Sequence, residues 1–475
     1  MALSDILSKI VGTQPFRIGE LNKHAAQSNT TPPSVAVANA NCGPDILVPP
    51  EYDAIHQLLI CKIPLLFVNG KAGTGKTTLI RYLESKFHDR NVAVLAPTGV
   101  AAINAGGQTL HSFFRLPPRF IFSDDIKEVS DRKLYRRLDL VIIDEISMVR
   151  ADVIDAIDKF LRLNGREPEK PFGGVPLLFL GDLFQLPPVV TREEEKFLSQ
   201  RDYATPYFFS ALCLQELDIR MVELTRVYRQ ADIRFSKMLS DLRLAENVAE
   251  TIRVINDECA LTEAQRPTTI TLTCTNSDAE ERNEAELSRC QGETYTFIGE
   301  KSGKFRVDQK NLPAPMNLQL RLGAQVMLTK NDEGRRWVNG TLAVIKGFEN
   351  GGIQASLLDD PATTFDIRRV KWESYKYTLS RDSIKIVPEV IGKYEQFPMM
   401  LAWAVTIHKS QGKTLDNVTV DLGNGAFAPG QVYVALSRCR TLDGIRLKRA
   451  LHLSDVRCDL RIRRFFEAAN FHQKA

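Results

Sequence analysis

Short apolar runs alternate with segments of helical spacing along the first part of the chain. Four of these runs end at a turn or a polar residue: "PLLFVNG", "NVAVLAP", "LVIIDE" and "PLLFLGD". Such runs are typical of strands that are buried on both faces of a parallel sheet. The segments "TTLIRYLESKF" and "ADVIDAIDKFLRL" carry apolar residues at helical spacing. The pattern therefore predicts a doubly wound α/β domain.

The helix expected to begin at Ala151 separates apolar from acidic positions. Because residues three and four apart share one face of a helix, its apolar side chains are expected to pack as core: Val153, Ile154, Ile157, Phe160 and Leu161. Its acidic side chains are expected to form a solvated or cap-forming face: Asp152, Asp155 and Asp158.

The alternation is less regular after about residue 213. "TTITLTCTN" predicts a strand, and "SDAEERNEAELSRC" predicts a helix opened by a Ser/Asp cap. Residues 345–395 are rich in β-branched and aromatic residues with Gly and Asp turns, which predicts a small β-barrel-like insertion. The α/β character returns at "MMLAWAVTIHKSQG".

These changes of pattern divide the chain into parts. The first is a short amphipathic piece followed by a linker of small, turn-forming residues. The expected parts are an N-terminal extension (1–48), a first α/β domain (49–212) with a small insertion at about 115–135, a second α/β domain (213–344 and 396–450) interrupted by the β insertion (345–395), and a C-terminal tail (451–475).

Length and composition place the chain among folded proteins of several domains. At 475 residues it is too long for one hydrophobic core. Its apolar fraction of 44% and charged fraction of 25% are those of average globular proteins. The net charge of +4 neither requires nor excludes a polyanionic partner, because a basic groove is compatible with a balanced total.

The cysteines and the apolar runs indicate the cellular compartment in which the chain is expected. The 8 cysteines are dispersed without a C-x-x-C pair or a zinc-ligand cluster, so reduced thiols are expected. No apolar run approaches the roughly 18 residues that span a bilayer, and the N-terminus lacks the features of a secretory signal. We therefore expect a soluble, cytoplasmic chain without a membrane partner.

The segment "FVNGKAGTGKTTLI" carries a phosphate-binding pattern. Gly70, Gly75, Lys76 and Thr77 stand at the spacing G-x-x-x-x-G-K-T, between a predicted strand and a predicted helix. In this pattern backbone amides face the phosphates, the lysine reaches the β and γ oxygens, and the hydroxyl binds Mg²⁺. The alternative, a chance Gly/Lys/Thr turn, has a frequency of about 1 in 100 for such a chain. The expected nucleotide-binding residues are Gly70, Lys71, Ala72, Gly73, Thr74, Gly75, Lys76, Thr77 and Thr78.

Two adjacent carboxylates follow the apolar run "LDLVII". In a P-loop sheet the carboxyl edge of a neighbouring strand lies beside the phosphates. Asp144 is therefore expected to hold Mg²⁺ through water, together with Thr77, and Glu145 to polarise the attacking water. The alternative is that both acids only favour the N-terminus of the following helix through its dipole, and the two roles are compatible.

Three further polar side chains suit phosphoryl transfer. Gln185 follows another strand end, where an amide can sense the γ-phosphate; a turn glutamine is the alternative. Arg229 and Arg438 can act as arginine fingers across a domain cleft, although each taken alone is more often a surface or ion-pair residue.

Eight runs stand in the order found in one enzyme family: "GKAGTGKTTL", "APTGVAAINAGGQTLHSFF", "VIIDEISMV", "PFGGVPLLFLGDLFQLPPVV", "VELTRVYRQ", "RRWVNGTLAVI", "AWAVTIHKSQGKTLDNVTVDLG" and "GQVYVALSRCRTLDGI". Over residues 65 to 445 or so, the chain resembles the superfamily 1B DNA helicases of the Pif (petite integration frequency) family, of bacterial type, with RecD-type enzymes as further relatives. "EISMVRADVIDAIDKFLR" occupies the place of the family's own signature segment.

The resemblance implies an ATP-dependent DNA helicase that moves 5′ to 3′ on single-stranded DNA, driven by two RecA-like domains that close on ATP. It implies roles in DNA repair, recombination, replication or telomere maintenance. The insertion at 115–135 corresponds to a strand-separating element and 345–395 to an SH3-like domain. The implied ligands are ATP, Mg²⁺, single-stranded DNA and forked duplex DNA, and one chain with two RecA-like halves can work as a monomer.

The resemblance also assigns individual residues. The nucleotide positions are Gly75, Lys76, Thr77, Asp144, Glu145, Gln185, Arg229 and Arg438. The DNA positions are Thr98, Gly99, Thr109, His111, Phe113, Asn339, Thr406, His408, Lys409, Ser410 and Gln411.

The residues themselves give weaker support for DNA contact. Short polar side chains and backbone amides suit phosphates, and the rings of His111, Phe113, His408 and Trp337 can stack on bases. For Phe113 and Trp337 a place in the core is an equally good interpretation. Read singly, both histidines are better explained as structural residues.

The sequence departs from the family pattern in one motif, and it leaves two alternative functions open. Many relatives carry a glutamine motif before the P-loop that reads adenine, whereas this chain has only the poorly matched Gln57. A RecD-like subunit of a larger DNA-processing complex would share the motifs. A regulatory ATPase that never translocates would not need Gln185 together with Arg229 and Arg438, the set that couples hydrolysis to closure of two domains.

Overall fold

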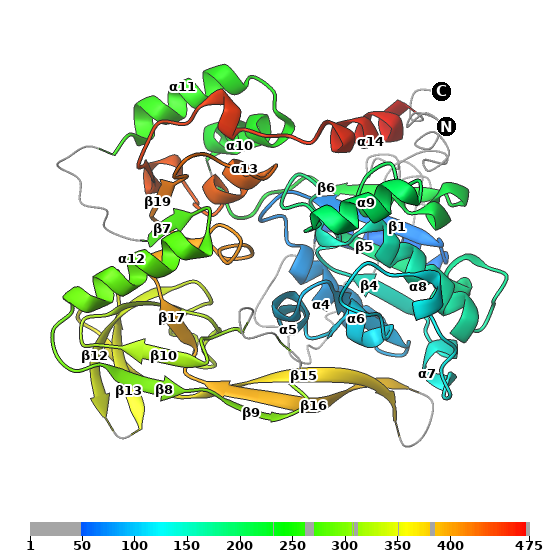
Figure 1. Cartoon of the computed structure of the whole chain (residues 1–475), viewed down its shortest axis with the longest axis horizontal. Coiled ribbons are helices and arrows are strands. Elements are labelled where there is room, and N and C mark those ends of the chain that lie inside the picture. The colour runs from blue at the N-terminus through cyan, green and yellow to red at the C-terminus, as the bar shows by residue number, and fades with distance from the viewer. Residues whose placement is uncertain are drawn as a thin grey trace, which may run out of the picture.

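The structure is a computed structural model that describes residues 49–471 except 231, 262–269, 306, 308–311, 350 and 381–384. The expected N-terminal extension, residues 1–48, lies outside the described residues. The described chain forms two α/β domains and an antiparallel β region (Figure 1). Among the described residues, no helix is both long and apolar enough to cross a membrane.

The first sheet has six strands in the order β3-β2-β4-β5-β1-β6, all parallel. Its strands are β1 Leu65–Gly70, β2 Val92–Ala96, β3 Gln108–Thr109, β4 Leu140–Ile143, β5 Leu177–Gly181 and β6 Ile219–Leu224. The four apolar runs of this part are β1, β2, β4 and β5, as the pattern predicted. β5 lies between β1 and β4, so its carboxyl end is next to the P-loop.

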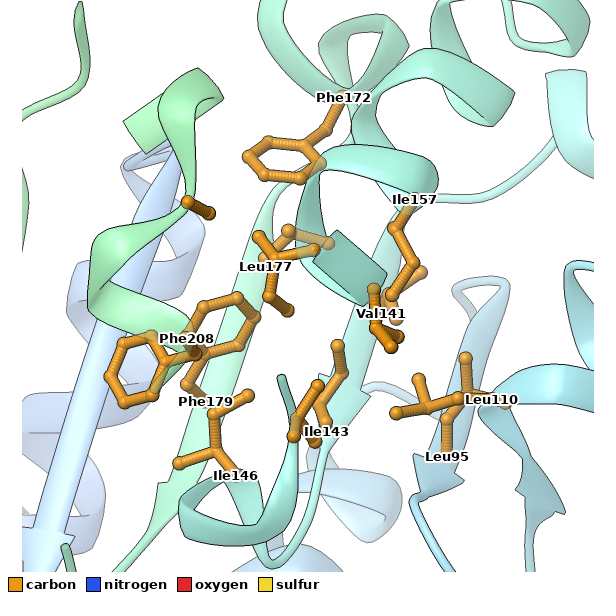
Figure 2. Close-up of a cluster of buried hydrophobic side chains, with 14 of the residues drawn as sticks. Leu95, Leu110, Val141, Ile143, Ile146, Ile157, Phe172, Leu177, Phe179 and Phe208 are labelled. Carbon is orange, nitrogen blue, oxygen red and sulfur yellow. The ribbon is translucent and has the colours of Figure 1, made fainter. Parts of the chain in front are cut away.

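Helices cover both faces of this sheet, because successive side chains of each strand point to opposite sides. Leu65 and Phe67 pack toward α8, whereas Leu66 and Val68 pack toward α3 and α4. Figure 2 shows the first of these clusters, with Val141 and Ile143 of β4 beside Leu177 and Phe179 of β5. The helices of the domain are α3 Pro50–Ile60, α4 Lys76–Lys86, α5 Gly99–Ala105, α6 Leu110–Phe113, α7 Lys133–Arg136, α8 Ala151–Asn164 and α9 Arg192–Gln200, with short 3₁₀ turns η1 Ser123–Asp125, η2 Ile146–Met148, η3 Pro171–Gly174, η4 Phe208–Ser210 and η5 Leu212–Glu216.

Helix α8 confirms the predicted core face and corrects the acidic one. All five predicted apolar side chains are buried. The expectation of a solvated or cap-forming face at Asp152, Asp155 and Asp158 is wrong as regards solvation, because their carboxylates accept backbone amide protons from neighbouring segments: from Ile121, from Leu212 and Cys213, and from Phe172, respectively. The acids are satisfied inside the fold, as buried carboxylates must be.

The second domain contains a parallel sheet in the order β18-β7-β19-β20. Its strands are β7 Ile270–Thr273, β18 Ala404–Thr406, β19 Val418–Asp421 and β20 Ile445–Leu447, and its helices are α10 Ile233–Leu244, α11 Val248–Cys259, α12 Asn276–Arg289 and α13 Gln431–Leu436, with the turn η7 Leu442–Gly444. The predicted strand at β7 and the helix at α12 are present. The cap of α12 is Thr275, whose hydroxyl accepts from the amide of Asp278, rather than the predicted Ser277 or Asp278.

Antiparallel strands extend beyond the predicted range 345–395 on both sides. They are β8 Tyr295–Ile298, β9 Glu300–Gly303, β10 Asn317–Leu320, β11 Gln325–Leu328, β12 Leu342–Glu349, β13 Gly352–Leu357, β14 Thr364–Ile367, β15 Val370–Leu379, β16 Ile386–Gln396 and β17 Met399–Leu401. β11 pairs with both β12 and β17, which joins the flanks of the predicted insertion to it. Pairing partners so distant in sequence leave no local signal.

The β15–β16 hairpin reaches from the β region to the first domain (Figure 1). The amide of Tyr377 donates to Gln108 Oε1 at 3.0 Å, and its hydroxyl accepts from the amide of Val94 at 3.0 Å. The amide of Ile386 donates to Asn91 Oδ1 at 2.7 Å. The hairpin is therefore docked on the first sheet's domain through main-chain and side-chain polar groups.

The chain crosses between the two α/β domains twice. The first sheet continues past the expected boundary at residue 212 through β6, and the first crossing follows it at residues 225–230. After β20, the turn η8 Leu453–Asp455 and helix α14 Leu460–Phe471 lead back. In Figure 1, α14 lies next to the first domain; Phe465 of this helix is buried in the core of that domain, and its ring is stacked on Phe209 at 4.4 Å.

Residues 115–135, the expected insertion, contain η1 and the start of α7 and lie against α8. The amide of Ile121 donates to Asp152, and the amide of Val129 donates to Asn164 Oδ1 at 2.8 Å. The described cysteines are all free, which agrees with the expected reduced state of these thiols: Cys61, Cys213, Cys259, Cys274, Cys290, Cys439 and Cys458.

Replacing Phe465 with alanine is expected to destabilise the first domain by about 3 kcal/mol, because it leaves a cavity under α14. The matched control is Leu460→Ala on the same helix, since that side chain is 63% exposed. Thermal unfolding followed by circular dichroism should show a clear loss for Phe465→Ala and almost none for the control. Equal melting curves for the two variants would contradict the packing of α14 described here.

Candidate functional site

A pocket of about 570 Å³ lies where the two α/β domains meet. The first domain contributes residues 72–78, Glu145 and Gln185, and the first crossing contributes Tyr228 and Arg229. The second domain contributes Gly412, Thr414, Arg438 and Arg440. The carboxyl ends of β1, β4 and β5 all open onto it, because parallel strands present the same end at one edge.

The P-loop has the shape that its glycines allow. β1 ends at Gly70 and α4 begins at Lys76. Gly73 and Gly75 have φ of 80° and 88°, a region that other residues adopt only with strain. A Cβ at Gly73 would lie 2.5 Å from that of Arg229, so the loop also fits closely against the first crossing.

Lys76 lies across the mouth of this loop. Its Nζ donates to the carbonyl oxygen of Gly70 at 2.7 Å and to that of Lys71 at 3.2 Å. Burial lowers its pKa, and the charge of Asp182, more than those of Glu145 and Asp144, opposes that shift. An ammonium held by two carbonyls in this way has donors that can transfer to phosphate oxygens.

Asp144 and Glu145 directly follow β4, and Glu145 lines the pocket. Asp144 is buried, and its Oδ1 accepts from the amide of Glu145 at 2.9 Å. Glu145 has a φ of 51°, a left-handed conformation that turns its side chain into the pocket. Burial first, then the charge of Asp144, raises the pKa of Glu145 to about 7. A carboxyl with a pKa near neutrality is suited to proton transfer.

The donors for a metal ion are limited to hard oxygens. The Thr77 hydroxyl and the Asp144 carboxylate are of the kind that Mg²⁺ prefers, and with a nucleotide Mg²⁺ needs only one or two protein ligands. Within the described part of the chain, no group of three or more His, Cys, Asp or Glu side chains gathers as a metal site. These oxygen ligands fit a Mg²⁺ ion that is bound together with a nucleotide, rather than a structural metal ion that is held by protein side chains alone.

Gln185 stands at the end of β5 and is buried. Its Nε2 donates to Asp182 Oδ2 at 3.2 Å, and its Oε1 accepts from Gln411 Nε2 at 3.2 Å. The same Gln411 nitrogen lies 3.3 Å from Glu145 Oε2. Gln411, expected at the DNA, therefore joins the second domain to two side chains of the first domain that line the pocket.

Arg229 and Arg438 enter the pocket side by side. Arg229 donates through Nε to Thr414 Oγ1 at 3.0 Å and through Nη1 to the carbonyl of Ser437 at 3.2 Å. Arg438 is fully buried and donates through Nε to the carbonyl of Val434 at 2.8 Å. Burial, followed by the charge of Arg229, lowers the pKa of Arg438 to about 9. Two cations held this close favour a polyanion between them.

One end of the pocket is aromatic. Pro49, Tyr52 and Tyr228 line it, and the Tyr52 hydroxyl donates to the carbonyl of Gly75 at 2.7 Å. Gln57, the poorly matched glutamine of the sequence, is exposed on α3 and is not among the lining residues. The tyrosines were missed because a tyrosine in a helix or loop carries no motif of its own.

Three more missed residues meet next to the P-loop: Asp182, Arg243 and Tyr433. Asp182 could have been found, because it follows an apolar strand just as Asp144 does. Arg243 and Tyr433 come from α10 and α13 of the other domain. Only the three-dimensional fold brings them to Asp182, so the sequence held no signal for them.

The expected DNA residues of the first domain gather at the ends of β2 and β3. Thr98 and Thr109 accept from backbone amides and cap α5 and α6. Gly99 is close to Val307, which would meet a Cβ there at 2.9 Å. Burial, more than the charge of Arg150, lowers the pKa of the partly buried His111.

Phe113 is in the core rather than on a surface. Its ring is 3% exposed and meets Tyr377 of the docked hairpin edge-on at 5.7 Å. Trp337 is 7% exposed and stacked on Phe365 at 4.8 Å. For both aromatics the structure shows the core placement that the sequence left as an alternative.

The expected DNA residues of the second domain lie on a loop after β18 and near its neighbour. His408 and Lys409 are exposed, whereas Thr406 accepts from the amide of Lys409 at 3.2 Å. Ser410 is buried, and its hydroxyl donates to the carbonyl of Ile407 at 2.7 Å. Asn339 Oδ1 accepts from Lys413 Nζ at 2.9 Å. His408 and Lys409 are thus the members of this set that are open to a ligand.

The chain matches known proteins along most of its length. The family model described as PIF1-like helicase matches residues 52–257. The ATP-dependent DNA helicase Pif1 of Bdellovibrio bacteriovorus is 33% identical over 391 residues, which are 80% of this chain and 83% of that protein. The ATP-dependent DNA helicase PIF1 of Mus musculus is 34% identical over 428 residues, which are 88% of this chain but only 62% of the mouse protein.

Solved structures of Pif1 from Bacteroides sp are similar to this fold. The unliganded form has a TM-score of 0.80 at 36% identity, covering 89% of this chain and 97% of that one. The form bound to single-stranded DNA has a TM-score of 0.65 at 36% identity, covering 90% and 98%. The arrangement described here is thus nearer to the unliganded form than to the DNA complex.

The raised pKa of Glu145 predicts a pH-dependent stability. Its folded-state pKa of about 7 exceeds the ordinary value of 4.5, so this carboxyl does not destabilise the fold below about pH 4.5, costs stability increasingly as the pH rises from 4.5 to about 7, and costs the full amount above that pH. Glu145→Gln is therefore expected to stabilise the protein by about 2 kcal/mol at pH 8 and by little at pH 4.5. Melting temperatures measured across this range check the sign. Glu193→Gln, at an exposed position, is the control, and a pH-independent difference for Glu145→Gln would contradict the buried placement.

Proposed function

This chain belongs to the family of PIF1-like helicases, and we propose that it is an ATP-dependent DNA helicase that moves 5′ to 3′ on single-stranded DNA. One observation carries the proposal: a single pocket is lined by the P-loop, Glu145 and Gln185 of one domain together with Arg229 and Arg438, which the rest of the chain brings to the same site. A site assembled by two domains ties hydrolysis to their relative movement.

The nucleotide chemistry follows from the side chains of the pocket. Lys76 would bind the β and γ oxygens, and the Thr77 hydroxyl with the Asp144 carboxylate would hold Mg²⁺, which supplies charge neutralisation at the phosphates. Glu145 would accept a proton from the attacking water, and Gln185 would contact the γ-phosphate. Arg229 and Arg438 would neutralise the charge that develops on the transferred group.

Adenine is proposed to bind at the aromatic end of the pocket. Tyr52 and Tyr228 offer ring surfaces there, and Pro49 closes the side. This arrangement does not use Gln57, the residue that the sequence comparison left in doubt.

The DNA contacts are proposed to lie on both domains. Thr98, Gly99 and Thr109 stand at helix starts of the first domain, where backbone amides and hydroxyls suit phosphates. His408 and Lys409 are exposed on the second domain. The relative from Bacteroides sp forms a complex with single-stranded DNA, which supports this class of ligand.

The remaining parts of the proposal concern the smaller elements. Residues 115–135 would meet the duplex at the fork, and the antiparallel β region would act as the SH3-like domain. A monomer would be sufficient, and a cytoplasmic place at the nucleoid would follow from a DNA substrate. The chain spans 62% of the length of the mouse helicase, so functions of the rest of that protein are not carried over.

ATP hydrolysis should rise many-fold when single-stranded DNA is added. Lys76→Ala should abolish turnover, because it removes a charge from the β and γ oxygens, whereas Glu145→Gln should bind ATP and lose hydrolysis by about 100-fold or more. Steady-state hydrolysis and nucleotide binding by fluorescence separate the two. Hydrolysis unchanged by DNA in the wild type would favour a regulatory ATPase instead.

A forked substrate tests the direction of movement. A duplex with only a 5′ single-stranded tail should be opened in the presence of ATP, and the same duplex with only a 3′ tail should not. Strand separation is measured with a fluorophore and quencher pair on the two strands of the duplex. The unwinding rates of the two substrates are compared on the same protein preparation, with Lys76→Ala as the inactive control. Preference for the 3′ tail would overturn the proposed polarity.

A further inference from the structure

Asp182 is a buried carboxylate that the catalytic assignment does not use. It follows β5, the strand between β1 and β4, and its side chain is fully buried. Its Oδ1 accepts from the amide of Phe184 at 3.2 Å, and its Oδ2 accepts from Gln185 Nε2 at 3.2 Å. These contacts within one domain fix the side chain of Gln185 relative to the strand end.

The other partners of Asp182 come from the second domain. Arg243 of α10 donates through Nε to Oδ1 at 3.0 Å, and its Nη2 lies 3.0 Å from the same oxygen. The Tyr433 hydroxyl of α13 donates to Oδ2 at 3.0 Å. Arg243 and Tyr433 are 4% and 3% exposed, so water does not compete for the carboxylate.

Tyr433 also contacts the P-loop. Its hydroxyl oxygen accepts from the amide of Ala72 at 3.1 Å while its proton goes to Asp182. A phenol has one proton, so the direction of this chain of hydrogen bonds is fixed from Ala72 through Tyr433 to Asp182. Next to it, Lys71 Nζ donates to Ser240 Oγ of α10 at 3.0 Å.

The charges around Asp182 keep it ionised. Burial raises its pKa, but the charges of Arg243 and Lys76 act in the other direction and hold the pKa below the usual value. Asp182 is also the carboxylate that most opposes the loss of charge at Lys76. A permanent negative charge therefore lies behind the P-loop when the two domains are together.

From this geometry we propose that Tyr433 and Arg243 are positioning residues for ATP hydrolysis, which act through Asp182 to set the P-loop at Ala72 and the side chain of Gln185 when the domains close. The inference rests on the proposed function. It assigns to the domain interface the positioning of the P-loop and of Gln185, in addition to the charge neutralisation proposed for Arg229 and Arg438.

The physical basis is that these contacts require α10 and α13 to lie against the first domain. If α10 and α13 withdraw, Ala72 loses its acceptor, and Asp182 keeps only its partners from its own domain. Buried polar groups that lose a hydrogen-bond partner in a site without water cost free energy. The network of Tyr433, Asp182 and Arg243 is therefore expected to be either complete or broken, with few intermediate arrangements. Such a device affects the rate of the hydrolytic step more than the binding of nucleotide.

The test is Tyr433→Phe, which removes one hydroxyl and keeps the ring. We expect kcat for DNA-stimulated ATP hydrolysis to fall about 10-fold, with KM for ATP changed by less than about 3-fold. The matched control is Tyr394→Phe in the β region, because that hydroxyl is also buried and lies 2.9 Å from the carbonyl of Ala314 and 3.0 Å from that of Pro315. The control should keep the wild-type kcat.

Arg243→Lys provides a second measurement, since it retains the charge and loses the Nε donor. If both residues act through Asp182, the double variant should lose less than the product of the two single losses. Thermal unfolding and binding of a fluorescent ADP analogue show whether each variant is folded.

The outcomes separate the inference from its premise. A folded Tyr433→Phe with wild-type kcat, or losses that multiply in the double variant, would overturn the inference. A wild-type protein whose hydrolysis ignores single-stranded DNA would instead refute the proposed function. A fall in kcat shared equally by Tyr394→Phe would show a general effect of buried hydroxyls and would also overturn it.

Discussion

The strands of the first sheet are buried on both faces, and the rest of the site depends on this constraint. A strand with apolar neighbours on each side can carry polar side chains only where it ends. In a parallel sheet those ends lie together, so the P-loop after β1, the acids after β4 and the pair Asp182 and Gln185 after β5 become neighbours. The same packing that stabilises the domain therefore concentrates its chemistry at one edge.

Charges at such an edge must balance one another, because little water reaches them. The first domain supplies the carboxylates Asp144, Glu145 and Asp182, and the second supplies Arg243 and Arg438. Asp182, for example, pairs with Arg243 across the domain boundary. Burial in the first place raises the pKa of Glu145 and lowers the pKa of Arg438, and the like charges of Asp144 and Arg229 add to these shifts.

The sequence predicted what local patterns encode. β1, β4, β5 and α8 appear where apolar runs and helical spacing indicated them, and Lys76 and Thr77 stand at the start of α4, in the strand-to-helix context that the P-loop spacing predicts. The errors concern contacts between distant segments. The acids of α8 accept hydrogen bonds from buried backbone amides of neighbouring segments, and β11 pairs with strands at both ends of the expected insertion. Tyr433 could not be recognised before its partner Ala72, 361 positions away, was known.

Helix α14 has a topological consequence. Since α3 begins the described chain on the first domain and α14 returns to it, the second domain is an insertion whose two ends are both anchored in its neighbour. A single nick in the segment 225–230 would leave the two domains held together by the docked return segment. Separating them as independent fragments would require either a second cut after β20, which leaves α14 on the first domain, or extraction of Phe465 from the core.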